Sequence, residues 1–346
     1  MFNYQEQRND AKSYKEAYVS DIRSFIENRY KQYEQQRNAY ITGIAQDPEK
    51  YRSDFRNMLG FPLNDEGMLQ EKATLSIELL EENNESTLHR ATVTTPLGIR
   101  FTGLLFLHNG DAPRPFIISQ HGGSGSPEVC SGILEGGSAN YNDMTQRIFN
   151  RGANVFAPQL LLWSNDYESE GFRREDRNPI DAQLKQMGGS ITALEVYCIM
   201  KALDTFCDEG IADEKHLGMI GLSYGGLYTL FTAAADKRIK AALSCSFFND
   251  RAKYAWIDWT WNDSAAHFFD AEIAMLVYPR PLCIAVGDED CMFDVTSAQT
   301  ELDRLHMLSQ KIYGNTDWLH TCVFQGNHEF IQSDNYIELV LAEVAK

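Results

Sequence analysis

The chain has 346 residues, 43% of them hydrophobic, which is enough to build a substantial buried core. Its 49 acidic and 31 basic residues give a formal net charge of −18, which argues against nucleic acid as a partner, because such partners need clustered Lys and Arg. No run of 18 apolar residues is present, and the first residues lack the basic-then-apolar order of a secretory signal, so we predict a cytoplasmic protein without a membrane-spanning helix.

The seven cysteines are scattered and never spaced as C-x-x-C, which predicts reduced thiols rather than disulfides or a structural zinc site. No metal or organic cofactor is expected. The acidic balance disfavours anionic substrates and favours neutral small molecules. A homo-oligomer is compatible with the sequence, which leaves the oligomeric state open.

The first sixty residues have a helical pattern. Apolar side chains recur there at three- and four-residue steps, which is typical of an amphipathic helix: Tyr18, Ile22, Phe25, Ile26 and Tyr30. A second short helix near 51–59 ends at Gly60, with Pro62 just beyond it. We predict that residues 1–65 form a helical N-terminal extension that packs on a main domain, residues 66–346.

From residue 73 the pattern changes to strands. Segments 73–80, 89–95 and 99–108 alternate or are β-branched, which predicts antiparallel strands, and 115–120 is a short apolar strand of the type buried in a parallel sheet. Strands then alternate with helices, with strands expected at 153–157, 216–222, 239–247, 281–286 and 319–324, and helices at 140–150, 189–206, 225–235, 295–312 and 331–345. This order predicts a mostly parallel central sheet with helices on both faces.

Two segments interrupt the alternation, residues 163–188 and 250–276, and we predict that they are lids or substrate loops. They contain Trp163, Trp256 and Trp259, which are candidates for contact with substrate. The sequence equally allows these indoles to be a packed cap over the core.

The motif with the clearest chemistry is Gly221-Leu222-Ser223-Tyr224-Gly225, a G-x-S-x-G pattern between a strand and a helix. In that setting the serine occupies a strained turn that projects its hydroxyl from the edge of the sheet. The helix that follows supplies backbone N–H groups and a positive dipole end for a developing oxyanion. We therefore predict that Ser223 is a nucleophile.

A serine nucleophile needs a histidine base held by a carboxylate. His328 follows the last predicted strand and precedes the last helix, so its loop lies at the same edge as Ser223. The next-to-last strand runs into an acidic turn, in which the spacing after Gly287 favours Asp290 as the carboxylate. The alternatives left open are Asp288, Asp294 and Asp250.

The remaining part of the predicted site is an oxyanion hole. Residues Gln120-His-Gly-Gly-Ser-Gly-Ser126 close the first parallel strand with a glycine-rich turn. The N–H of Gly123, together with the N–H of Tyr224, is expected to hold the oxyanion, and each such donor is typically worth about 3 kcal/mol in the transition state.

From about Arg114 to Phe330 the chain resembles the acetyl xylan esterase and dienelactone hydrolase-like branch of the α/β-hydrolases. The resemblance rests on five short segments: the glycine-rich turn at 120–126, Met187 to Leu194, the serine motif, Tyr278-Pro-Arg-Pro281 and Gly326 to Phe330. Residues Met58 to Pro62 are also similar to that group. It implies an α/β-hydrolase fold, and it gives Ser223, Asp290 and His328 the roles of a catalytic triad. The chain departs from the dienelactone hydrolases in one respect, since those enzymes use a cysteine nucleophile and this chain has serine.

The sequence therefore predicts a serine esterase that forms an acyl-enzyme and removes small acyl groups, such as acetyl, from a sugar or another small ester. An acylated oligosaccharide or other small-molecule ester is the expected partner. Two alternatives are a serine peptidase of the same fold and a non-catalytic ligand-binding protein.

Overall fold

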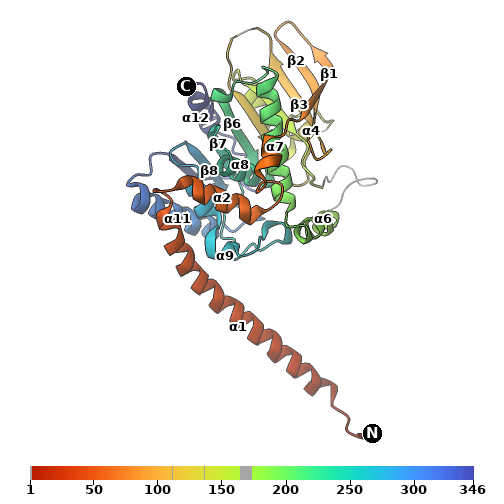
Figure 1. Ribbon diagram of the computed structural model, residues 1–346, viewed down its shortest axis with the longest axis vertical. Coiled ribbons are helices and arrows are strands. Elements are labelled where there is room, and N and C mark those ends of the chain that lie inside the picture. Colours follow the sequence, from red (N-terminus) through yellow and green to blue (C-terminus); the bar gives the residue numbers. More distant parts are fainter. Residues whose placement is uncertain (1, 111, 136, 164–173) are drawn as a thin grey trace.

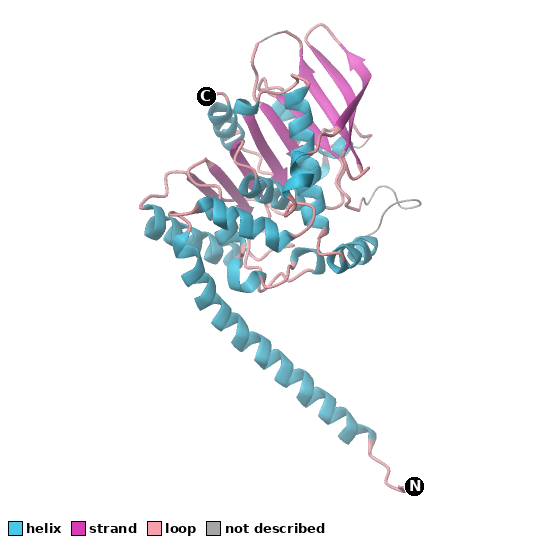
Figure 2. Ribbon diagram, viewed as in Figure 1, coloured by secondary structure: helices cyan, strands magenta, loops and turns pink. Residues whose placement is uncertain are grey.

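A computed structural model describes residues 2–110, 112–135, 137–163 and 174–346. Its centre is a nine-stranded sheet in the order β1-β2-β3-β5-β4-β6-β7-β8-β9 (Figures 1 and 2). The strands are β1 (Thr74–Glu82), β2 (Ser86–Thr94), β3 (Arg100–His108), β4 (Phe116–Gln120), β5 (Asn154–Pro158), β6 (Leu217–Leu222), β7 (Ile239–Cys245), β8 (Leu282–Gly287) and β9 (Leu319–Phe324).

The sheet has an antiparallel part and a parallel part. Strands β1, β2, β3 and β5 pair antiparallel, whereas β5, β4 and β6 to β9 all run parallel. Parallel strands present their carboxyl ends at one edge, so the loops after β4, β6, β8 and β9 converge there. These four loops contain every residue of the predicted catalytic site.

Helices cover both faces of the sheet, as the alternation predicted. Along β4, the side chains of Phe116 and Ile118 join the core under α2, α7, α8, α10 and α11, whereas Ile117 joins the core under α4, α5 and α12. This two-residue alternation is what a strand buried on both faces requires. The helices of eight or more residues are α1 (Arg8–Tyr40), α2 (Pro48–Leu59), α6 (Arg174–Gln186), α7 (Ile191–Asp208), α8 (Tyr224–Ala235), α11 (Val295–Tyr313) and α12 (Asn335–Val344).

Shorter helices lie in the connections. They are α3 (Glu66–Gln70), α4 (Pro127–Cys130), α5 (Met144–Phe149), α9 (Ser264–His267) and α10 (Asp270–Met275), with single 3-10 turns η1 (Ile41–Gly43), η2 (Ala139–Tyr141), η3 (Glu214–His216) and η4 (Ile257–Trp259). Helix α2 is integrated in the main core, because Phe55 and Leu59 are buried against it. Within the described residues, no helix combines the length and apolar character needed to cross a bilayer.

The expectation that the N-terminal extension packs on the main domain is wrong for most of α1. Figure 1 shows this helix projecting away from the body. Tyr18, Phe25 and Ile26 are 67%, 64% and 45% exposed. Only the last turns are anchored, where Arg37 is buried and forms an ion pair with Glu272 at 3.2 Å. The apolar stripe correctly predicts a helix, but amphipathicity does not show what covers the apolar face of that helix.

The two segments that interrupt the alternation are only partly loops. Residues 174–186 of the first form α6, and residues 164–173 lie outside the described part of the chain. The second contains η4, α9 and α10.

Candidate active site

Ser223 occupies a tight turn between β6 and α8. Its backbone adopts φ 58° and ψ −119°, a conformation that costs free energy for a residue with a side chain. Its N–H donates to the carbonyl of Cys245 at 2.8 Å, which fixes the turn to the end of β7. The motif's glycines are required by close packing, since a Cβ on Gly225 would lie 2.1 Å from the carbonyl oxygen of Gln120.

The glycine-rich turn after β4 lies directly against this serine. A Cβ on Gly122 would lie 2.9 Å from Ser223 Cβ, and one on Gly123 would lie 2.5 Å from the indole of Trp163. The N–H of Gly122 donates to Tyr141 Oη at 2.9 Å. The Gly123 N–H makes no hydrogen bond to any group in the described part of the chain, so it can serve a substrate oxygen.

His121 fixes the orientation of that turn, a role that sequence reasoning missed. Its ring is fully buried, with Nε2 accepting from the N–H of Leu160 at 2.9 Å. Nδ1 must then carry the proton, and it donates to the carbonyl of Gly122 at 2.8 Å. Burial lowers the pKa of His121 to about 4, an effect that the Gly122 hydrogen bond offsets only in part, so the ring is neutral at pH 7.

At the same edge of the sheet, His328 and Asp290 form a hydrogen-bonded pair. His328 Nδ1 lies 2.8 Å from Asp290 Oδ2, and the Asp290 side chain is only 4% exposed. The other carboxylate oxygen accepts from the N–H groups of Met292 and Phe293 at 2.8 and 3.0 Å. The aspartate is therefore held rigidly, and the imidazole is left with Nε2 as its available nitrogen.

The other three acids have different partners. Asp288 accepts from the N–H of Gly326 at 3.0 Å, and Asp294 caps the start of α11 by accepting from Thr296 and Ser297. Asp250 accepts from the N–H of Ala252 within its own turn. Of the four candidates, the structure brings Asp290 to His328.

The end of β7 lies between the serine and the histidine. The Ser223 N–H is bonded to Cys245, and Ser246 Oγ donates to the carbonyl of Glu329, next to His328, at 3.0 Å. Ser223 Oγ and the imidazole are not hydrogen-bonded to each other in the described structure. Catalytic hydrogen bonds of this type often tighten only when substrate binds.

Aromatic side chains surround the start of α8. Trp163 meets the ring of Tyr224 edge-on at 5.4 Å, and Trp256 lies 6.2 Å from it. Together these three residues line a pocket of about 240 Å³ whose other walls are formed by α6 and residues 255–258. Trp163 and Trp256 thus line a pocket, and their contact with substrate stays a prediction.

Trp259 packs against Trp256, with ring centroids 4.4 Å apart, but does not line the pocket. It is 2% exposed and packs against Phe247, Tyr224 and Phe293. Its indole thus belongs to a packed cap over the core, the second interpretation that the sequence allowed. Neither face of the indole is available to a ligand.

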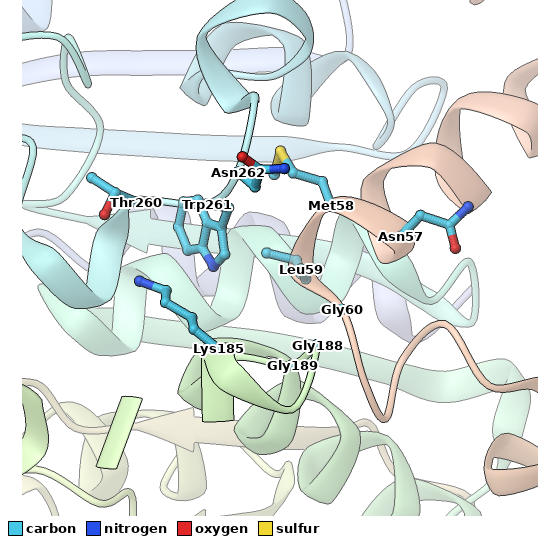
Figure 3. A pocket seen from close by; sticks show the side chains of 10 residues that line it. All are labelled: Asn57, Met58, Leu59, Gly60, Lys185, Gly188, Gly189, Thr260, Trp261 and Asn262. Carbon is cyan, nitrogen blue, oxygen red and sulfur yellow. The ribbon is translucent and has the colours of Figure 1, made fainter. Parts of the chain in front are cut away.

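A separate hollow of about 570 Å³ lies between the end of α2, the α6–α7 turn and residues 260–262 (Figure 3). Trp261 and Lys185 point into this region, and Lys185 Nζ also donates to the carbonyl of Ile257 at 2.6 Å. None of the predicted catalytic residues lines it.

Comparison with known proteins supports the fold. Residues 194–339, which include the serine, aspartate and histidine described above, match the prolyl oligopeptidase family. A curated relative, "Putative hydrolase YtaP" of Bacillus subtilis, is 26% identical over 197 residues, which are 52% of this chain and 62% of that protein. The match thus spans less than two thirds of the relative's length.

Solved structures share the fold at low sequence identity. An acetyl xylan esterase from Paenibacillus sp. R4 superimposes with a TM-score of 0.56 at 13% identity, covering 87% of this chain and 94% of its own. A glucuronoyl esterase from Solibacter usitatus gives a TM-score of 0.59 at 14% identity, with 79% and 86% covered.

Proposed function

We infer that this chain, which has the α/β-hydrolase fold, is a serine hydrolase that cleaves carboxylic esters through an acyl-enzyme. The observation that carries the proposal is the convergence at one sheet edge of a strained serine turn, a glycine turn packed against it, and a buried aspartate–histidine pair. A structural role for Ser223 alone would not require this set.

In the proposed first step, His328 Nε2 takes the proton of Ser223 Oγ as the oxygen attacks the ester carbonyl. The carbonyl oxygen becomes an anion and accepts hydrogen bonds from the N–H groups of Gly123 and Tyr224. Asp290 keeps the proton of the imidazole on Nδ1 and stabilises the imidazolium that forms.

The tetrahedral intermediate then collapses. His328 gives its Nε2 proton to the alcohol oxygen, the alcohol leaves, and the acyl group remains on Ser223. A water molecule, deprotonated by the same nitrogen, attacks the acyl-enzyme, and the second collapse returns the proton to Ser223 and releases the acid.

The proposed substrate is a small acyl ester, such as an acetyl group on a sugar or another small alcohol. The 240 Å³ pocket beside Tyr224 has room for a small substituent, and its indole rings suit the apolar face of a sugar. The net charge of −18 makes a neutral substrate preferable to an anionic one.

The test is hydrolysis of p-nitrophenyl acetate and butyrate by the wild type and Ser223→Ala, purified side by side. We expect wild-type turnover, and its loss in the variant by a factor of about 10⁴ or more. Activity that survives the substitution would show that another group does the chemistry. The acetate-to-butyrate ratio measures the size of the acyl pocket.

A second candidate is a serine peptidase, which the match to the prolyl oligopeptidase family favours. The same triad cleaves amides if the site can protonate and release an amine. Hydrolysis of proline p-nitroanilides faster than of p-nitrophenyl esters, with the same dependence on Ser223, would move the assignment to this class.

A further inference from the structure

A buried charged cluster that the proposed chemistry does not use borders the pocket beside Tyr224. It consists of Arg177 on α6, Glu195 on α7 and Asp258 in η4, which are 1%, 5% and 3% exposed. Two carboxylates face one guanidinium, so each charge is compensated only while the arginine stays in place. Burial of charged groups costs free energy, and here that cost falls next to the candidate site.

Arg177 uses all three of its nitrogens. Nε donates to Asp258 Oδ2 at 2.8 Å, and Nη2 donates to Glu195 Oε2 at 3.0 Å and to Tyr228 Oη at 2.6 Å. Nη1 donates to the carbonyl of Leu161. Burial opposes the charged form, but Glu195, Tyr228 and Asp258 outweigh it and raise the pKa of Arg177. One side chain therefore joins four segments of the chain.

The first of these links fixes one wall of the pocket. The backbone of Leu161 is held on both sides, because its carbonyl accepts from Arg177 and its N–H donates to Glu195 Oε1 at 2.6 Å. Two residues later, Trp163 is bonded to Ser124 through its own carbonyl and its indole N–H. The indole also lies against Gly123, so the position of Leu161 sets the position of this wall relative to the oxyanion hole.

The second link fixes the adjoining wall, in which Tyr224 meets Trp163 edge-on. Asp258 Oδ2 accepts from Arg177 and also from Tyr224 Oη at 2.8 Å. Asp258 belongs to the segment that carries Trp256, and Tyr224 is the residue whose N–H is the second proposed oxyanion donor. Both aromatic walls thus depend on the same guanidinium.

We propose that Arg177 is a positioning residue, which keeps Trp163 in edge-on contact with Tyr224, 5.4 Å between ring centroids, and thereby sets the acyl-size selectivity of the site. The inference rests on the proposed esterase function. Lysine cannot replace the arginine, because a single ammonium cannot reach acceptors on four segments at once. Arg177→Lys keeps the positive charge but removes the planar guanidinium that donates to all four partners.

The test compares Arg177→Lys with Arg304→Lys. Arg304 is a second largely buried arginine that bridges two carboxylates, Glu272 and Glu301, and contacts none of the pocket residues. We expect both variants to lose thermal stability. Only Arg177→Lys should change the acetate-to-butyrate ratio of kcat/KM, by about fivefold or more, as the pocket widens.

A second readout does not depend on activity. Of the five tryptophans, Trp259, Trp261 and Trp318 are 2%, 7% and 4% exposed, so acrylamide quenching reports mainly on Trp163 and Trp256. Quenching should rise in Arg177→Lys and stay at the wild-type value in Arg304→Lys. If Arg177→Lys does not fold, Asp258→Ala tests the second link, because Arg177 and Glu195 remain a balanced pair there.

The outcomes separate the two proposals. Wild-type esterase activity with an unchanged ratio and unchanged quenching in Arg177→Lys would overturn the positioning role and leave the esterase function standing. Absence of any wild-type ester hydrolysis would overturn the function, and unchanged quenching in the same variant would then overturn the positioning role as well. A changed ratio with raised quenching, absent from Arg304→Lys, supports it.

Discussion

The imidazole of His121 holds the carbonyl of Gly122 through a 2.8 Å hydrogen bond from Nδ1. Because the carbonyl and the following N–H of a trans peptide point in opposite directions, this bond turns the N–H of Gly123 away from the His121 ring, and we expect that N–H to face the oxyanion. His121→Phe keeps a ring in place but removes the donor. We expect kcat on p-nitrophenyl acetate to fall by about 10- to 100-fold, with KM little changed, since one oxyanion donor is misdirected. An unchanged kcat would contradict this arrangement.

The same buried ring should make stability depend on pH. Its pKa in the folded chain is about 4, below the ordinary value of 6.5, so the unfolded chain binds a proton more readily between these values. The stabilisation is complete above pH 6.5 and is lost as the pH falls towards 4, by about 2 kcal/mol at pH 5. Urea unfolding at pH 7 and pH 5 should show this difference in the wild type. His121→Phe should lack that part of the pH dependence. An equal loss of unfolding free energy between pH 7 and pH 5 in both proteins would refute the role of His121.

The acidic turn after β8 allows a matched pair of substitutions. Asp290→Asn keeps the size of the side chain but disturbs the tautomer of His328, and we expect kcat to fall by about 10⁴. Asp288→Asn keeps an oxygen that can accept from Gly326, so its kcat should stay close to the wild-type value. Ester hydrolysis by the two variants measures the contrast, and the reverse ranking would transfer the role to Asp288.

Removal of residues 1–28 should leave the body intact. The deleted part of α1 is exposed along its length, and the remaining turns keep the buried ion pair between Arg37 and Glu272. We expect the Tm of the truncated chain to agree with that of the full chain within about 2 °C. Arg37→Ala, in contrast, removes that pair and the hydrogen bond to Ala265 and should destabilise by about 1–3 kcal/mol. A large loss of Tm on truncation would mean that the outer turns are covered in solution.

The mostly parallel sheet and its flanking helices could be predicted because buried strands and amphipathic helices leave periodic patterns within short windows. The strand predicted at 319–324 coincides with β9, and the helix at 225–235 differs from α8 by one residue. The sequence does not predict helix α6, because this helix is polar, contains Pro179 and lies in a segment predicted to be a loop. Its fully buried positions include the charged residues Arg177 and Asp181, so burial there leaves no apolar pattern.

The candidate site also contains residues that the sequence could predict and residues that it could not. Ser223, Asp290 and His328 each follow a strand and carry a local signal, so the sequence alone could nominate them. Arg177 and Asp258 are 81 residues apart and meet only through tertiary packing, so no local pattern marks either of them. His121 lies inside a motif that was recognised for its glycines, and its role depends on which way its ring turns.

The edge strand β1 could pair with a strand of another molecule and so extend the sheet. β1 is solvent-exposed over almost its whole length, and its apolar residues Ile77, Leu79 and Leu80 are 40%, 51% and 43% exposed. A free edge of this kind is a template for intermolecular pairing. The strand carries Glu78, Glu81 and Glu82 among those side chains, and a register shift between Leu79 and Glu81 bends it. A second copy that paired with this edge would bring carboxylates within about 5 Å of one another. The repulsion between these carboxylates and the register shift therefore disfavour aggregation through edge-to-edge pairing.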